Sequence, residues 1–138
     1  MNLEPLLQAP LAVKLHVFTV VPAFVLGTWL LFASEKGSSN HRLLGKVYLT
    51  LMSVTALAAT FIRSFSGFSV DVGPFRFGLL HLFVVLTAWS VWSAPRAARA
   101  GHLASHKGAM RGLYFGGLIV AGILAFAPGR VMYRMFLE

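Results

Sequence analysis

The sequence contains no cysteine. Disulfide bonds, thiolate-ligated iron–sulfur clusters and thiol catalysis are therefore excluded, and cysteine usage gives no information on the redox state of the compartment. Acidic side chains are nearly as scarce, and the four that occur lie outside the apolar segments: Glu4, Glu35, Asp71 and Glu138. Paired-carboxylate catalysis, His-Glu zinc motifs and carboxylate relays across a membrane thus have no basis in the sequence, and a redox role is the only enzymatic class with support.

Charged residues of both signs make up only 12% of the 138 residues, whereas hydrophobic residues make up 57%. A soluble domain usually carries about twice that charged fraction. The apolar residues form four runs, each about as long as a helix needs to be to cross a hydrocarbon core of about 30 Å. We therefore predict an all-α integral membrane protein with a single domain over residues 1–138, an up-down bundle of four transmembrane helices at residues 11–33, 42–65, 75–95 and 106–128.

Basic residues outnumber acidic ones and give a formal net charge of +8. Because they gather at the ends of the apolar runs, topology and lipid headgroups explain them better than nucleic acid does. The first and third connecting loops carry most of them, namely Lys36, Arg42 and Lys46, and Arg96, Arg99, Lys107 and Arg111. The positive-inside rule therefore places these two loops in the cytoplasm and both termini on the outer side.

The chain contains an internal similarity at an offset of 65 residues. Residues 15–20 read LHVFTV and residues 80–85 read LHLFVV. The same offset relates His16 to His81 and His41 to His106. Chance matches between apolar segments are common, so the paired histidines carry the inference. We predict a duplicated two-helix unit, with repeats at 11–65 and 76–130, of a kind familiar in membrane proteins.

The paired histidines are candidate axial ligands of b-type haem. We expect His16 and His81 at a similar depth in the outer leaflet, where an ionisable side chain suggests a function, and His41 and His106 near the cytoplasmic interface. Each pair comes from helices that are diagonal in an up-down bundle, so its rings could face each other across the core and ligate haem iron. The flanking cations would then contact haem propionates or anionic lipid headgroups: Arg42, Lys46, Lys107 and Arg111.

Small residues lie on the same faces as the histidines. Ala23 and Gly27 follow His16 at helical spacing, which would leave room for a flat cofactor or equally allow close helix packing. Gly108, Gly112 and Gly116 repeat at four-residue intervals off the His106 face. We interpret these three glycines as a helix-packing ridge.

Two stretches resemble the bacterial family of predicted membrane proteins called domain of unknown function 2306 (DUF2306): KGSSNHRLLGKVYLTLM, and HLASHKGAMRGLYFGGLIVAGILAFAPGR. The pattern includes Lys-Gly, then His-Arg and Gly, a His-basic-x-x-Met segment and a closing Pro-Gly-Arg, which in this chain are Lys36, Gly37, His41, Arg42, Gly45, His106, Lys107, Met110, Pro128, Gly129 and Arg130. Lys107 departs mildly from the expected arginine. The resemblance implies a four-helix fold in the bacterial inner membrane and no established activity.

Three functions remain open from the sequence. We expect first a small multi-pass inner-membrane protein with a structural or accessory role, whose histidines form hydrogen bonds between helices. The alternative is a b-type haem protein that exchanges electrons with a membrane redox partner or a quinone. A small transporter is a further alternative, although four short helices leave little room for a pore without a homo-oligomer. Other metals are disfavoured, because two histidines per layer are fewer than the ligands zinc usually takes.

Overall fold

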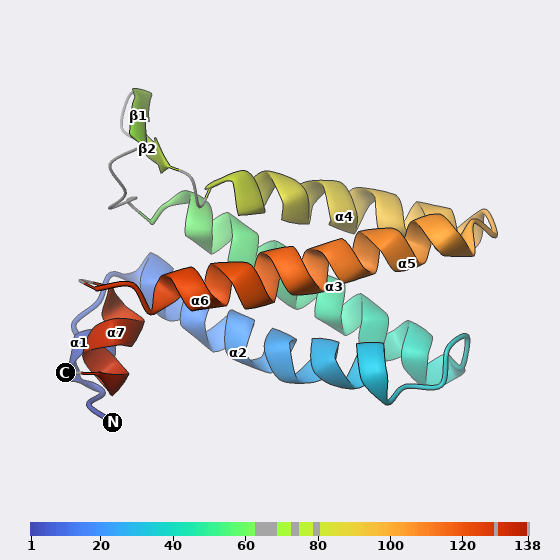
Figure 1. Cartoon of the computed structure of the whole chain (residues 1–138), viewed down its shortest axis with the longest axis horizontal. Helices are drawn as coiled ribbons and strands as arrows, with labels where there is room; N and C mark the ends of the chain where they lie inside the picture. The colour runs from blue at the N-terminus through green and yellow to red at the C-terminus, as the bar shows by residue number, and fades with distance from the viewer. Residues whose placement is uncertain (63–68, 73–74, 79–80, 129, 138) are drawn as a thin grey trace.

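The computed structural model describes residues 1–62, 69–72, 75–78, 81–128 and 130–137, with residues 69–72 and 75–78 described by their backbone alone. Its elements in chain order are α1 (Glu4–Leu7), α2 (Leu11–Phe32), α3 (Ser39–Thr60), β1 (Ser69–Val72), β2 (Phe75–Gly78), α4 (His81–Arg99), α5 (Leu103–Gly112), the π-helical segment η1 (Leu113–Val120), α6 (Ala121–Ala125) and α7 (Val131–Phe136). The long helices run along one axis, and α1 and α7 lie together beside the two termini (Figure 1).

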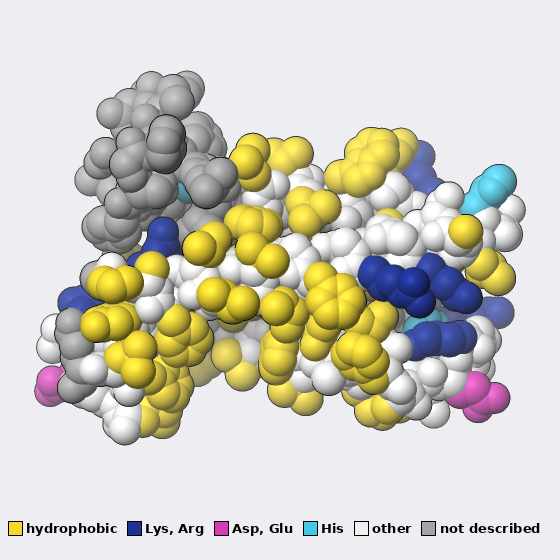
Figure 2. Space-filling model, viewed as in Figure 1, with side chains coloured by type: hydrophobic (Ala, Val, Ile, Leu, Met, Phe, Trp, Pro, Cys, Tyr) yellow, Lys and Arg dark blue, Asp and Glu magenta, His cyan; other side chains and the backbone are white. Residues whose placement is uncertain are grey.

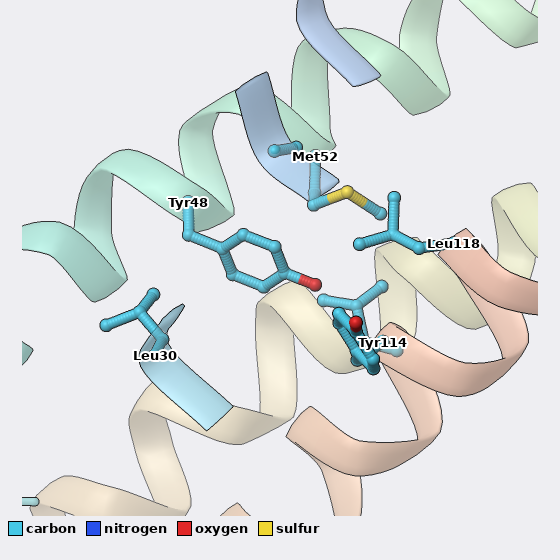
Figure 3. Packing of buried hydrophobic residues seen from close by; sticks show 7 residues of the cluster. Leu30, Tyr48, Met52, Tyr114 and Leu118 are labelled. Atoms are coloured by element: carbon cyan, nitrogen blue, oxygen red, sulfur yellow. The ribbon is translucent and has the colours of Figure 1, made fainter. Parts of the chain in front are cut away.

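Four long helical segments form a closed ring of neighbours: α2, α3, α4 and the last long helix, which runs through α5, η1 and α6. The helix α2 packs on α3 and η1, and α4 packs on α3, α5 and η1. Consequently α2 lies diagonally opposite α4, and α3 lies diagonally opposite η1 (Figure 1). The centre is filled by side chains from three of these segments: Ala23, Leu30, Tyr48, Met52, Leu113, Tyr114 and Leu118 (Figure 3).

In the part of the chain that the structure describes, three helices are long and apolar enough to cross a membrane: Leu11–Phe32, Ser39–Thr60 and the continuous run Leu103–Ala125. The prediction of a membrane fold built from apolar helices is confirmed, and the short β1–β2 ribbon is added to them. Large apolar side chains point outward, and Phe18 and Ile123 each keep 68% of their surface exposed. Figure 2 shows hydrophobic side chains along the length of the molecule and a concentration of Lys and Arg toward one end. Lipid would cover these apolar surfaces.

The remaining long helix differs from the prediction for residues 75–95. The helix α4 begins at His81, and Phe75–Gly78 instead pairs with Ser69–Val72 as an antiparallel ribbon. The order Phe-Arg-Phe alternates apolar and charged residues, which is the two-residue period of a strand. Pro95 and Arg96 lie in the last turns of α4. Among the described residues, α4 is not one of the helices apolar enough to count as a span.

The segment η1 winds as a π-helix in the middle of the last long helix. A regular α-helix was expected there. We attribute the difference to the neighbouring glycines, because glycine destabilises a regular α-helix. Only part of the predicted glycine ridge packs closely against another helix. A Cβ on Gly116 would lie 2.7 Å from Cδ2 of Leu86, whereas no described atom lies within 4 Å of the corresponding positions at Gly108 and Gly112.

Candidate functional site

His16 joins the two helices of the first hairpin. Its Nδ1 atom lies 3.1 Å from the backbone carbonyl oxygen of Thr55 on α3. A carbonyl oxygen only accepts, so the geometry assigns the proton to Nδ1 and leaves a lone pair on Nε2 when the ring is neutral. The hydroxyl oxygen of the same Thr55 lies 2.7 Å from that of Thr19, which follows His16 by about one turn, and this contact also connects α2 with α3. These contacts are polar links between two apolar helices.

His106 has the same role in the second hairpin. Its Nδ1 atom lies 2.9 Å from the carbonyl oxygen of Ala94 on α4. By the same reasoning Nδ1 donates and Nε2 carries the lone pair. Each hairpin therefore has one histidine that hydrogen-bonds to the backbone of the neighbouring helix, rather than to another side chain.

The other two candidate ligands lie at opposite ends of the bundle. His41, in the first turn of α3, has Nδ1 2.8 Å from Oγ of Ser34, and it is close enough to Lys36 and His106 for their charges to interact. His41 and His106, the pair expected near the cytoplasmic interface, therefore lie at the same end of the bundle. His81 is the first residue of α4, which starts at the same end of the bundle as α2 (Figure 1). A facing arrangement of His16 and His81 stays a prediction.

Two tyrosine rings fill the core beside the small residues of α2. A Cβ on Gly27 would lie 2.8 Å from Cε2 of Tyr48 and 3.2 Å from Cδ2 of Tyr114. Ala23, one turn earlier, is fully buried. Figure 3 shows both rings pointing into the centre of the bundle. The space that a flat cofactor would need beside Gly27 is occupied by these side chains, so here the small residues serve helix packing.

The hydroxyl groups of the two tyrosines have different partners. Tyr114 lies 2.8 Å from Oγ1 of Thr28, whose own proton goes to the carbonyl oxygen of Phe24 at 2.7 Å. Tyr114 is therefore the donor of that pair. The hydroxyl of Tyr48 is buried and has no hydrogen-bond partner in the part of the chain that the structure describes. Only tertiary packing reveals which of the two hydroxyls finds an acceptor, so the sequence could not assign their partners.

A group of cations lies where α2 ends. Lys36 donates from Nζ to the carbonyl oxygens of Leu30 and Leu31, two of the last residues of α2. A cation there complements the negative end of the helix dipole. Desolvation lowers the pKa of Lys36, and the charges of Arg111 and Lys107 lower it further. Figure 2 shows this concentration of basic side chains beside a histidine.

The predicted lipid or propionate contacts belong to the same end of the fold. Arg42 and Lys46 are exposed on the first two turns of α3, and Lys107 and Arg111 are exposed on α5. Whether they meet headgroups or propionates stays a prediction. Within the described ranges no group of three or more His, Cys, Asp or Glu side chains could hold a metal ion.

Comparison with known proteins gives a match to a protein family. No curated protein and no solved structure is significantly similar to this chain. The sequence does match the family described as predicted membrane protein (DUF2306) over residues 13–135, which is nearly its full length. The chain therefore belongs to the DUF2306 family of predicted membrane proteins.

Proposed function

We propose that the protein is a structural or accessory subunit of the bacterial inner membrane, and that its histidines hold helices together. The observation that carries this proposal is the pairing of His16 and His106 with backbone carbonyls of the neighbouring helices, at 3.1 and 2.9 Å. Hydrogen bonds between membrane helices contribute about 0.6 kcal/mol on average and up to about 1.7 kcal/mol. Two of them, one in each hairpin, would favour this bundle over other arrangements of the same apolar helices.

The closed core supports the same role. A transported solute or a reactant needs an interior space, and the centre of this bundle is occupied by Tyr48, Met52 and Leu113, each less than 3% exposed. Close-packed protein interiors leave little free volume. We therefore assign the function to the outer surface, which would contact lipid or a membrane partner. A second copy of this chain is one such partner.

Four membrane crossings, with both termini outside, are part of the proposal. The helices α3 and α5 start at the same end of the bundle, and α4 runs back between them (Figure 1). Both α3 and Leu103–Ala125 qualify as spans, so their common starting end supports a return of the chain across the membrane along α4 as the fourth crossing. The offset of 65 also supports a duplication, because α3 at Ser39–Thr60 maps onto 104–125, within one residue of Leu103–Ala125.

A b-type haem protein that transfers electrons is the second candidate, and one observation favours it. Histidines that ligate a metal usually donate their other ring nitrogen to a carbonyl or carboxylate, which fixes the ring and leaves Nε2 for the metal. His16 and His106 both have this arrangement. The first haem would take His16 and His81, the second His41 and His106, and haem would supply one-electron chemistry.

A visible absorption spectrum separates the two candidates. We would purify the protein in detergent from haem-replete cells and record the spectrum oxidised and then reduced with dithionite. A sharp reduced α-band that is lost in the His16→Ala, His81→Ala double variant would establish the haem protein and refute the purely structural role.

A colourless preparation would leave the structural role, which then needs its own test. His16→Ala should lower the unfolding free energy by about 0.6 to 1.7 kcal/mol in detergent. The matched control is His102→Ala, because His102 is exposed and its side chain makes no capping hydrogen bond to α5. Equal stability of the two variants would contradict the proposal.

A further inference from the structure

A groove follows the seam between α3 and α4 on the outside of the bundle. Its volume is about 610 Å³, within the range of small-molecule sites. Small side chains from both helices form much of its wall, among them Ala56 and Ala88. Toward the end of α4 its lining changes to Arg96 and Arg99. The groove is thus apolar over most of its length and cationic at one end.

The hydroxyl groups in the wall do not make it polar. Ser53 donates to the carbonyl oxygen of Leu49 at 2.7 Å, Thr60 to Ala56 at 3.0 Å and Thr87 to Phe83 at 2.8 Å. Each proton is used by the helix that carries the hydroxyl. The wall therefore offers no spare hydroxyl proton to a ligand, which suits an alkyl chain and disfavours a polar solute.

The cationic end lies at the level where lipid headgroups are expected. His106, near the start of α5, bonds to Ala94, so the residues after Ala94 lie toward that end of the bundle. Arg96 and Arg99 are exposed there. The guanidinium of Arg96 lies 4.2 Å from the ring centroid of Trp92, which holds it beside the groove. Tryptophan and arginine together are typical of a membrane–water interface.

The length of the groove fits one leaflet. Val84 and Arg96 both line it, and twelve residues of helix separate them, a rise of about 18 Å. Half of a bilayer hydrocarbon core is about 15 Å. We propose that this groove binds one anionic phospholipid of the leaflet next to Arg96 and Arg99, with an acyl chain between α3 and α4 and the phosphate at the two guanidinium groups. This assignment does not depend on the role of the histidines.

Native mass spectrometry from detergent tests the proposal with two lipids, phosphatidylglycerol and the zwitterionic phosphatidylcholine. The wild-type protein should retain one phosphatidylglycerol per chain in preference to phosphatidylcholine. The Arg96→Gln, Arg99→Gln double variant should bind phosphatidylglycerol about tenfold more weakly and lose the preference. The charge-matched control is Lys14→Gln, Arg134→Gln, which removes two cations outside both the groove lining and the set of predicted headgroup contacts, and it should keep the preference.

A second variant tests the apolar part of the groove. Ala88→Leu places a larger side chain in the groove and should weaken the binding of both lipids. Ala98→Leu changes another exposed alanine of α4, outside the groove lining, and should weaken neither. Equal retention of the two lipids by the wild-type protein, or equal losses in the two double variants, would overturn the proposal. A dimer of the wild-type chain that disappears in Ala88→Leu would overturn it too, because a second protein copy would then occupy the groove.

Discussion

Gly27 of α2 lies so close to Tyr48 of α3 that a methyl group on Gly27 would be 2.8 Å from Cε2 of that ring. The ring of Tyr114 from η1 approaches the same position at 3.2 Å. Three of the four long helical segments thus meet at one glycine. Any larger residue would have to displace an aromatic ring, and both rings are buried in the centre of the bundle.

We predict that Gly27→Ala destabilises the protein. Overpacking a close-packed core costs about 1 to 3 kcal/mol, so the midpoint of thermal unfolding in detergent should fall. Gly45→Ala is the matched control, because Gly45 lies inside α3 with no described atom within 4 Å of its Cβ position. There alanine should add about 0.5 to 1 kcal/mol through its better helix propensity. A Gly27→Ala protein as stable as Gly45→Ala would show that the rings do not pack on Gly27.

Removing the hydroxyl of each core tyrosine should have opposite effects. Tyr48→Phe removes a buried hydroxyl that has no partner among the described residues, so it should be neutral or stabilising. Tyr114→Phe removes the donor to Thr28 and should cost about 0.6 to 1.7 kcal/mol. The unfolding free energies of both variants in one detergent give the comparison, and a larger loss for Tyr48→Phe would contradict the hydrogen-bond assignment.

The Tyr114–Thr28 pair can be checked further by a double-mutant cycle. Thr28→Val keeps the shape of the side chain and removes its hydroxyl. The double variant with Tyr114→Phe should be more stable than the sum of the two single losses predicts, by about the energy of one interhelical hydrogen bond. Strict additivity would mean that the two hydroxyls, 2.8 Å apart, do not interact.

The histidines illustrate what the sequence could and could not predict. Hydrophobic run lengths were enough for three spans, because a hydrocarbon core demands long apolar helices. The offset of 65 identified His16 and His106 as unusual, yet their acceptors are backbone carbonyls of Thr55 and Ala94. Every residue carries a carbonyl, so no side-chain pattern marks the acceptor, and only the helix packing selects it. The two-residue period of Phe75–Gly78 is present in the sequence, but the apolar residues around it favoured the prediction of a helix.

Lys36 should be unusually reactive toward acylating reagents. Desolvation and the charges of Arg111 and Lys107 lower its pKa below the ordinary 10.5, so more of its amine is neutral near pH 8.5 than in the unfolded chain. Peptide mapping after brief acetylation of the folded and the denatured protein should show faster labelling in the folded state. In the Lys107→Gln, Arg111→Gln variant the pKa should partly recover and the rate should fall.

The lowered pKa of Lys36 also determines whether the stability of the protein rises or falls with pH. Because the pKa of Lys36 is lower in the folded protein than in the unfolded chain, folding disfavours its charged form. Its contribution to stability is least favourable below the lowered pKa. The contribution improves as pH rises toward 10.5, where both states lose the proton. In Lys36→Gln this part of the pH dependence should disappear, and an unchanged pH profile would contradict the proposed environment.

Single-cysteine labelling decides the number of crossings and the orientation, and the chain suits it because it has no native cysteine. We expect Gln8→Cys to react with an impermeant maleimide in intact cells. Ser39→Cys and Ser105→Cys, at the starts of α3 and α5, should react only after lysis. If α4 did not cross the membrane, Ser39 and Ser105 would lie on opposite sides and differ in labelling. If both reacted in intact cells and Gln8 did not, the four crossings would stand and the orientation inferred from the basic loops would be reversed.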